Sequence, residues 1–89
     1  MYEVKRMVTF QGAGPVKAYC DVEVSGFLLK GLRVLKGAHG LFVSLPRQEG
    51  TDHRWYESVV PTNRQVMTTL SKDVLTAYKD TLATLEATR

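Results

Sequence analysis

Four basic side chains lie in a stretch of this chain that contains no carboxylate. Between Val24 and Gln48 there is no Asp or Glu, and the basic residues there are Lys30, Arg33, Lys36 and Arg47. The whole chain carries 12 Lys and Arg against 9 Asp and Glu, a net charge of +3. A basic surface on one side of a domain favours a polyanion such as nucleic acid as its partner. Bases on the outer faces of strands also keep a sheet edge soluble, so both interpretations stay open.

Aromatic side chains beside an arginine offer a second kind of contact with nucleic acid. Arg54, Trp55 and Tyr56 are consecutive, and exposed aromatic rings stack on the bases of single strands. Neighbours in a strand point to opposite faces, so we expect one of these two rings in the core and the other in solvent. Tyr19 is expected on the polar face of its strand. Packing between strands is the alternative role for all three rings.

Residues that could perform catalysis or bind a metal are few. His39 and His53 are 14 residues apart, with no further Cys or His at metal-ligand spacing. His53 follows Asp52 and could act as a base, but a solvated loop histidine is the commoner case. The glycines at 12 and 14 lack the third glycine and the following helix of a dinucleotide-binding loop. We therefore expect no enzyme, no metal, no cofactor and no small-molecule substrate.

The length and composition indicate one small domain. At 89 residues the chain is expected to form a single domain over residues 1–89. Its apolar stretches are far shorter than the roughly 20 residues of a membrane helix, and its first six residues include an acid and two bases, unlike a signal peptide. One cysteine cannot form an internal disulfide. We expect a soluble cytoplasmic protein with no membrane contact, in which Cys20 is a small buried side chain.

Five segments have the composition and alternation of strands, and glycines and prolines separate them. Ala18, Cys20, Val22 and Val24 alternate with polar residues and should face the core. Gly31 lies inside a strand-like run and indicates a bulge. The expected strands cover residues 3–10, 16–25, 27–36, 41–45 and 54–60, with a polar loop over residues 47–53.

A β-hairpin is expected over residues 31–46. Gly37 and Gly40 frame its turn, and Pro46, which has no N–H for the strand ladder, ends its second strand. The residues of this hairpin expected to pack in the core are Leu32, Val34, Leu41, Phe42 and Val43.

The C-terminal third has the pattern of one amphipathic helix. Thr62 and Gln65 resemble a capping box, which favours a start near Asn63, with Ser71 as the alternative cap. Threonines such as Thr68, Thr69, Thr76 and Thr81 lower the helix propensity, so packing of the apolar stripe must stabilise the helix. Residues beyond Leu85 are expected to fray. The stripe recurs at three- and four-residue steps through Val66, Leu70, Val74, Ala77, Tyr78 and Leu82.

These elements predict an α+β fold. An antiparallel sheet of about five strands, over about residues 2–60, precedes one C-terminal helix over about residues 63–85. A single helix leaves sheet edges and apolar surface uncovered, and in so small a chain dimerisation is the usual remedy. We therefore expect a homodimer, which would also bring two basic surfaces together.

Residues 31–46 resemble the hallmark segment of the SpoVG family. They read Gly-Leu-Arg-Val-Leu-Lys-Gly-Ala-His-Gly-Leu-Phe-Val-Ser-Leu-Pro; the family has an Ile/Leu-Arg-Val-Ile/Leu strand, a Gly-Xaa-Xaa-Gly turn, Leu-Phe-Val and a Met/Leu-Pro stop. Trp55 stands where the family has an aromatic residue, and residues 61–63, Pro-Thr-Asn, stand for its Pro-Ile-Asn. Val74-Leu75-Xaa-Xaa-Tyr78 matches the family's helix. The resemblance covers residues 31–78, over half of the chain.

The resemblance implies a bacterial cytoplasmic regulator that binds DNA and RNA as a homodimer. The family is linked to septation, sporulation and the control of virulence genes, and is not known for catalysis. Its nucleic-acid contacts are attributed to basic residues in the loop after the Met/Leu-Pro stop and on the C-terminal helix. Carried onto this chain, the expected nucleic-acid-binding residues are Arg47, Arg54, Arg64 and Lys72.

This chain departs from the family pattern at the expected site. Gln48 and Glu49 occupy positions that are usually basic, Met67 occupies a helix position that is usually Arg, and Val60 replaces a His. The alternative function is a protein-interaction module in cell-division control that binds nucleic acid only weakly and without sequence preference. An enzyme is the third possibility, and a turnover abolished by His53→Ala would indicate it.

Overall fold

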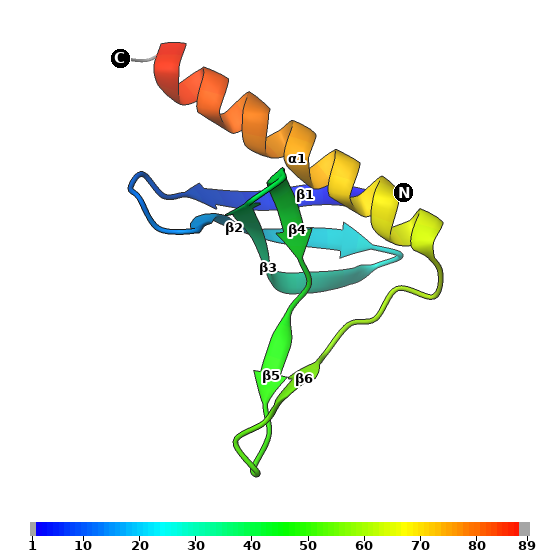
Figure 1. The fold of residues 1–89 in the computed structure, drawn as a ribbon. Coiled ribbons are helices and arrows are strands. Elements are labelled where there is room, and N and C mark those ends of the chain that lie inside the picture. Colours follow the sequence, from blue (N-terminus) through cyan, green and yellow to red (C-terminus); the bar gives the residue numbers. More distant parts are fainter. Residues whose placement is uncertain (1, 88–89) are drawn as a thin grey trace.

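A meander of four antiparallel strands carries the fold, and one long helix lies across one of its faces (Figure 1). The computed structural model describes residues 2–87. The sheet order is β1-β2-β3-β4, while β5 and β6 pair only with each other. The elements are β1 Tyr2–Thr9, β2 Val16–Val24, β3 Phe27–Gly37, β4 Gly40–Ser44, β5 Arg47–Glu49, β6 Trp55–Glu57 and α1 Arg64–Ala87.

The α+β class is confirmed, but the main sheet has four strands where about five were expected. Pro46 follows β4 and cannot donate to a ladder, so the chain leaves the sheet at that residue. Residues 47–49, expected as loop, instead form β5 and pair with β6. The Ser58 N–H donates to the Pro46 carbonyl over 3.2 Å and closes the base of this β5–β6 hairpin. Figure 1 shows the hairpin pointing away from α1.

The core lies between the sheet and α1. Alternation along β2 and the apolar stripe of α1 both face this layer, as the sequence predicts. Burial of each large side chain contributes roughly 1.5–3 kcal/mol to the stability of the fold. Packing in this layer therefore stabilises a helix whose intrinsic propensity is low. Cys20 is buried as expected, and burial raises the pKa of its thiol to about 11. The buried residues are Ala18, Cys20, Val22, Leu32, Val34, Val43, Leu70, Val74 and Tyr78.

The predicted hairpin turn after β3 and the predicted bulge within β3 are both present. Gly37 pairs with Gly40 across a two-residue turn, which confirms the hairpin. Cys20 pairs with Leu32 but Val22 pairs with Leu29, so two residues of β3 oppose Asp21 alone. Gly31 sits in this bulge at φ +82°, a conformation that favours glycine. Its N–H donates to the Asp21 carboxylate over 3.2 Å.

The start of α1 differs from the predicted capping box. The Asn63 side-chain oxygen accepts the Val66 N–H over 2.9 Å, so Asn63 is the N-cap and Thr62 is not. Threonine hydroxyls along the helix donate to carbonyls one turn back, as Thr81 does to Ala77 over 2.9 Å. The helix continues to Ala87, two residues past the expected end. Within the described residues 2–87, no helix is both long and apolar enough to cross a membrane.

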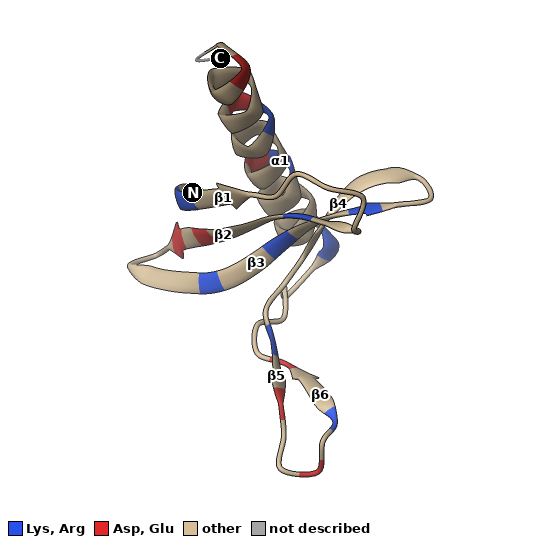
Figure 2. Ribbon diagram, turned by 90° about the vertical axis from the view of Figure 1, so that its left-hand side faces the viewer, with Lys and Arg blue, Asp and Glu red and all other residues tan. Residues whose placement is uncertain are grey.

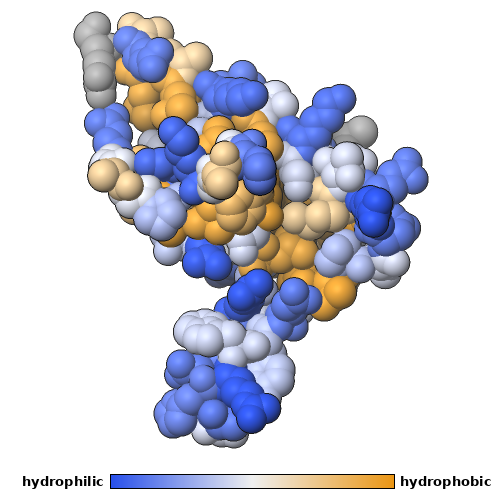
Figure 3. All heavy atoms as spheres, viewed as in Figure 1, coloured by the Kyte–Doolittle hydropathy of each residue, from blue (hydrophilic) through white to orange (hydrophobic). Residues whose placement is uncertain are grey.

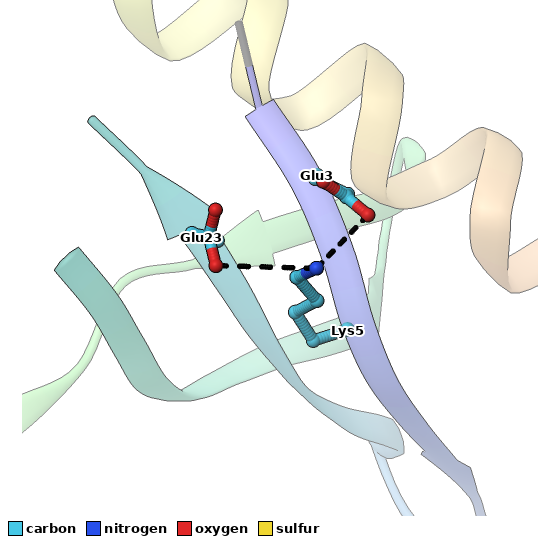
Figure 4. A network of polar contacts seen from close by, with 3 residues as sticks. All are labelled: Glu3, Lys5 and Glu23. Atoms are coloured by element: carbon cyan, nitrogen blue, oxygen red, sulfur yellow. Dashed lines mark hydrogen bonds and ion pairs between the residues drawn. The ribbon is translucent and has the colours of Figure 1, made fainter. Parts of the chain in front are cut away.

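The exposed side of β1 carries a small charge network (Figure 4). Lys5 lies where β1 shifts register against β2, between Val4 and Arg6. Its Nζ is 3.0 Å from a Glu3 oxygen and 3.9 Å from a Glu23 oxygen. The hydrogen bond to Glu3 is the main cause of the raised pKa of Lys5. All three groups are exposed, so the network adds little stability. The ammonium group of Lys5 is nevertheless paired with carboxylates of its own chain.

Leu32 supplies a test of the core. It stands on β3 and is fully buried in the core, so Leu32→Ala should lower the free energy of unfolding by about 2–5 kcal/mol, the usual range for a buried leucine. Urea unfolding followed by circular dichroism at one protein concentration measures this change. Val60→Ala, at a 63% exposed position in the segment before α1, should change stability by less than about 0.5 kcal/mol. Equal losses in both variants would contradict this assignment of the core.

Candidate nucleic-acid interface

The sheet face opposite α1 is uncovered. Strand register places Val8, Tyr19, Arg33 and Ser44 in one row across all four strands of this face. The edge of one ring of the Phe10–Tyr19 pair meets the face of the other, with centroids 5.3 Å apart and planes at 89°. The Arg33 guanidinium is half-buried and donates to the Ser44 hydroxyl over 3.4 Å. An aromatic ring and an arginine are therefore fixed side by side on this face.

A pocket of about 430 Å³ lies between this face and the β5–β6 hairpin. We call it the sheet–hairpin pocket. It contains three cations and two aromatic rings, and no carboxylate lines it. Figure 2 shows Lys and Arg along β3 and on the hairpin below it. The lining residues are Tyr19, Lys30, Gly31, Arg33, Pro46, Arg47 and Trp55.

Two local features of the backbone bring these side chains together. The bulge at Gly31 interrupts β3 between Lys30 and Leu32, and both Lys30 and Gly31 line the pocket. Pro46 directs the chain out of the sheet, which makes Arg47 the first residue of β5. The pairing of Glu49 with Trp55 then places Trp55 on the same hairpin face as Arg47.

The cations of the pocket are not neutralised by neighbouring acids. Within residues 2–87, no carboxylate oxygen lies within 4.0 Å of a side-chain nitrogen of Lys30, Arg33 or Arg47. Glu57 is the cross-strand neighbour of Arg47 but forms no ion pair with it at that distance. The pocket therefore presents three cations without an ion pair next to flat apolar rings, a combination suited to phosphates and bases.

The tip of the hairpin is a compact turn held by its own side chains. The Gly50 N–H donates to the Arg54 carbonyl over 2.8 Å, and the His53 N–H donates to the Gly50 carbonyl over 3.1 Å. His53 adopts φ +63°, the left-handed position that glycine usually takes in a three-residue hairpin loop. The Tyr56 hydroxyl donates to the Asp52 carboxylate over 2.5 Å. This bond lowers the pKa of Asp52, with help from the Arg54 N–H, and raises that of Tyr56.

Only one of the four predicted binding residues lines the pocket. Arg47 does so. Arg54 precedes Trp55 on the exposed hairpin but does not line the pocket, Arg64 is the first residue of α1, and Lys72 is exposed two turns further along that helix. Their roles in binding stay predictions. Lys30, Arg33 and Tyr19 were not named as site residues, although both cations belong to the stretch without carboxylates.

Two expectations about aromatic side chains are wrong. Trp55 and Tyr56 are 63% and 52% exposed, although one of them was expected in the core. They do point to opposite faces of a strand, but the hairpin projects from the body, so neither face is covered. Phe42 was expected to pack in the core and is 48% exposed, because it pairs with Leu35 on the face away from α1.

The departures from the family pattern have structural consequences. Glu49 lies directly across from Trp55, which places a carboxylate on the hairpin face that carries Arg47. Met67 packs against the core and lines a separate hollow of about 300 Å³ beside Phe42 and Arg47. An apolar contact thus occupies this position of the helix. Basic character lies instead on the sheet floor of the pocket, at Lys30 and Arg33.

Comparison with known proteins identifies relatives along nearly the whole chain. The SpoVG family model matches residues 2–80. A protein of Archaeoglobus fulgidus named septation protein SpoVG is 34% identical over 76 residues, which cover 84% of this chain and 89% of the relative. Proteins with that name from Symbiobacterium thermophilum and Listeria monocytogenes are 35% and 30% identical, over 75% and 74% of this chain. The matches cover 49% and 66% of those two relatives.

Gly50→Ala tests the construction of the hairpin tip. A Cβ at Gly50 would lie 2.8 Å from Cε2 of Tyr56 and 2.9 Å from Oδ1 of Asp52, so the variant should separate these two side chains. The pKa of Tyr56 should then fall and that of Asp52 should rise toward their ordinary values. Titrations of labelled tyrosine ring carbons and aspartate carboxyls by NMR measure both changes.

The same bond gives the hairpin a defined pH dependence. Because the folded pKa of Asp52 is lowered, its contribution is present above the ordinary aspartate pKa and is lost as the pH falls through the lowered value. Because the folded pKa of Tyr56 is raised, its contribution to stability is lost as the pH rises through the raised value.

The control for Gly50→Ala is His53→Gly, which relieves φ +63° and should leave the titrations of Asp52 and Tyr56 unchanged. Identical Tyr56 titrations in Gly50→Ala and the parent protein would contradict the proposed contact.

Proposed function

The chain belongs to the SpoVG family, and on that premise we propose that it is a regulatory protein that binds DNA or RNA as a homodimer, with a role in septation, sporulation and gene control. The names of its relatives support the link to septation. The observation that carries nucleic-acid binding is the sheet–hairpin pocket, where Lys30, Arg33 and Arg47 meet Tyr19 and Trp55 without a carboxylate. Phosphate contacts position such a protein and supply most of its affinity, while contacts to bases add discrimination.

The wider set of phosphate contacts is proposed to include Arg47, Arg54, Arg64 and Lys72. Arg47 and Arg54 stand near opposite ends of the β5–β6 hairpin, and both are exposed. Arg64 begins α1, where the backbone N–H groups and the helix dipole also favour an anion. Nucleic acid bound at the hairpin and at the start of the helix would contact all three arginines.

Arg47→Ala combined with Arg54→Ala should weaken binding to nucleic acid. Each lost phosphate contact should reduce the steepness of log K against log salt by about one unit on a duplex and by about 0.7 on a single strand, so the double variant should lose about two units on the duplex. Gel-shift titrations on double-stranded DNA, single-stranded DNA and RNA at two salt concentrations measure affinity and slope together. Glu49→Lys, which places a base opposite Trp55, should strengthen binding and steepen the slope by about one unit.

A control variant removes two positive charges from lysines whose side chains already contact other groups of the protein. Lys5 is held by Glu3, and Lys17 donates to the Gly12 carbonyl over 2.9 Å. Lys5→Ala combined with Lys17→Ala should therefore change affinity much less than the arginine pair. An equal loss in both double variants would show that only net charge matters and would contradict the site. Absence of binding by the parent protein to all three nucleic acids would favour the protein-interaction module.

Dimerisation is proposed because the described fold leaves apolar surface uncovered. Phe27 is 74% exposed beside Leu28, and orange residues reach the surface of the body in Figure 3, whereas the hairpin is mostly hydrophilic. Strands β1 and β4 also end the sheet with unpaired edges. Sedimentation equilibrium of the purified protein should give twice the chain mass of 10.0 kDa. A mass of one chain throughout the micromolar range would contradict the homodimer.

A further inference from the structure

We propose that the sheet–hairpin pocket holds one unpaired nucleobase and its flanking phosphates, so that this protein binds single-stranded nucleic acid in preference to a duplex. This inference rests on the proposed function and adds to it the form of the nucleic acid and the residues that select it. The selecting residues are Tyr19 and Trp55, which would contact the base, and Lys30, Arg33 and Arg47, which would contact phosphates.

The two rings of the pocket come from different elements and meet only in the folded chain. Tyr19 stands on β2 and Trp55 on β6, and both line the same pocket of about 430 Å³. This volume falls within the range of about 300–1,000 Å³ that small-molecule sites occupy. A base offers its flat face to such rings only when it is unstacked from its neighbours, as in a single strand, because the faces of duplex bases are covered.

The exposure of Trp55 needs an explanation that packing does not give. Its side chain is 63% exposed on a hairpin that leaves the body of the domain, so little of its apolar surface is buried in the isolated chain. Tyr19 is held in place by the edge-to-face contact with Phe10. A stacked base would cover the apolar surface of Trp55 while its phosphates remain in water, and every base has such a face.

The charges favour a nucleic acid over an uncharged or apolar occupant. Three cations line the pocket, and in the described part of the chain none has a carboxylate oxygen within 4.0 Å. Arg33 is held by Ser44 and is preorganised, while Lys30 and Arg47 are exposed and can follow a flexible backbone. Three phosphate contacts to a single strand correspond to a salt slope of about −2.

The experiment uses the fluorescence of Trp55, which is the only tryptophan of the chain. The full chain is titrated with a short oligothymidylate, an oligouridylate of equal length and a DNA duplex of equal length, at matched phosphate concentration. Both single strands should quench the fluorescence to saturation, and the duplex should quench it far less. The ratio of the two single-strand affinities then distinguishes DNA from RNA as the preferred source of the base.

Variants separate stacking from charge. Trp55→Ala should weaken single-strand binding, followed by anisotropy of a labelled strand, by about tenfold or more with the salt slope unchanged. Trp55→Phe keeps a ring and should recover most of this loss. Lys30→Ala should instead reduce the slope by about 0.7. Lys79→Ala, the control, removes one exposed cation of α1 that does not line the pocket and should leave both quantities unchanged.

Three other results would overturn the proposal, and each identifies a different reason. Equal affinity of Trp55→Ala and the parent protein, or equal quenching by duplex and single strands, would leave nucleic-acid binding in place and remove the stacking site. Equal quenching by oligoglutamate would show that the pocket responds to negative charge alone. Absence of binding to all three nucleic acids would remove the proposed function together with this inference.

Discussion

A single helix can bury only one face of a four-stranded sheet, and the rest of this structure depends on that constraint. Within residues 2–87, the nine buried residues come from β2, β3, β4 and α1, and they lie between the sheet and the helix. The other face must meet water, a partner or a ligand. Its row of Val8, Tyr19, Arg33 and Ser44 mixes apolar, aromatic and cationic groups, which is a composition suited to a ligand that has both flat apolar surfaces and negative charge.

Pro46 turns this open face into a pocket. Continuation of β4 would have extended the sheet, whereas the proline ends the ladder and sends β5 and β6 out beside it. The hairpin has no core of its own, so it is held by backbone hydrogen bonds at its base and by the Asp52–Tyr56 bond at its tip.

The sequence predicted those features that depend on residues close together along the chain. Alternation identified Ala18, Cys20 and Val22 as core residues, and a glycine inside a strand identified the bulge at Gly31. The exposure of Trp55 and the position of Lys30 in the pocket were not predictable in this way. Both depend on which strands pair and on which elements cover each face of a strand. These tertiary contacts produce no repeating pattern in the sequence.

The local features that work against stability lie outside the core, on the β5–β6 hairpin, at the start of α1 and at the β2–β3 turn, where Ser25 adopts φ +50° and Phe27 is 74% exposed. His53 adopts a left-handed conformation without being glycine, and Trp55 exposes a large apolar ring. Arg64 places a cation in the first turn of α1, where the helix dipole opposes it and no acidic residue compensates. In the core, by contrast, propensity, pattern and packing agree. Proteins tolerate such local conflicts mainly where function requires them. Those on the hairpin and at the start of α1 therefore agree with the proposed binding surface, and those at the β2–β3 turn agree with the proposed contact between two copies of the chain.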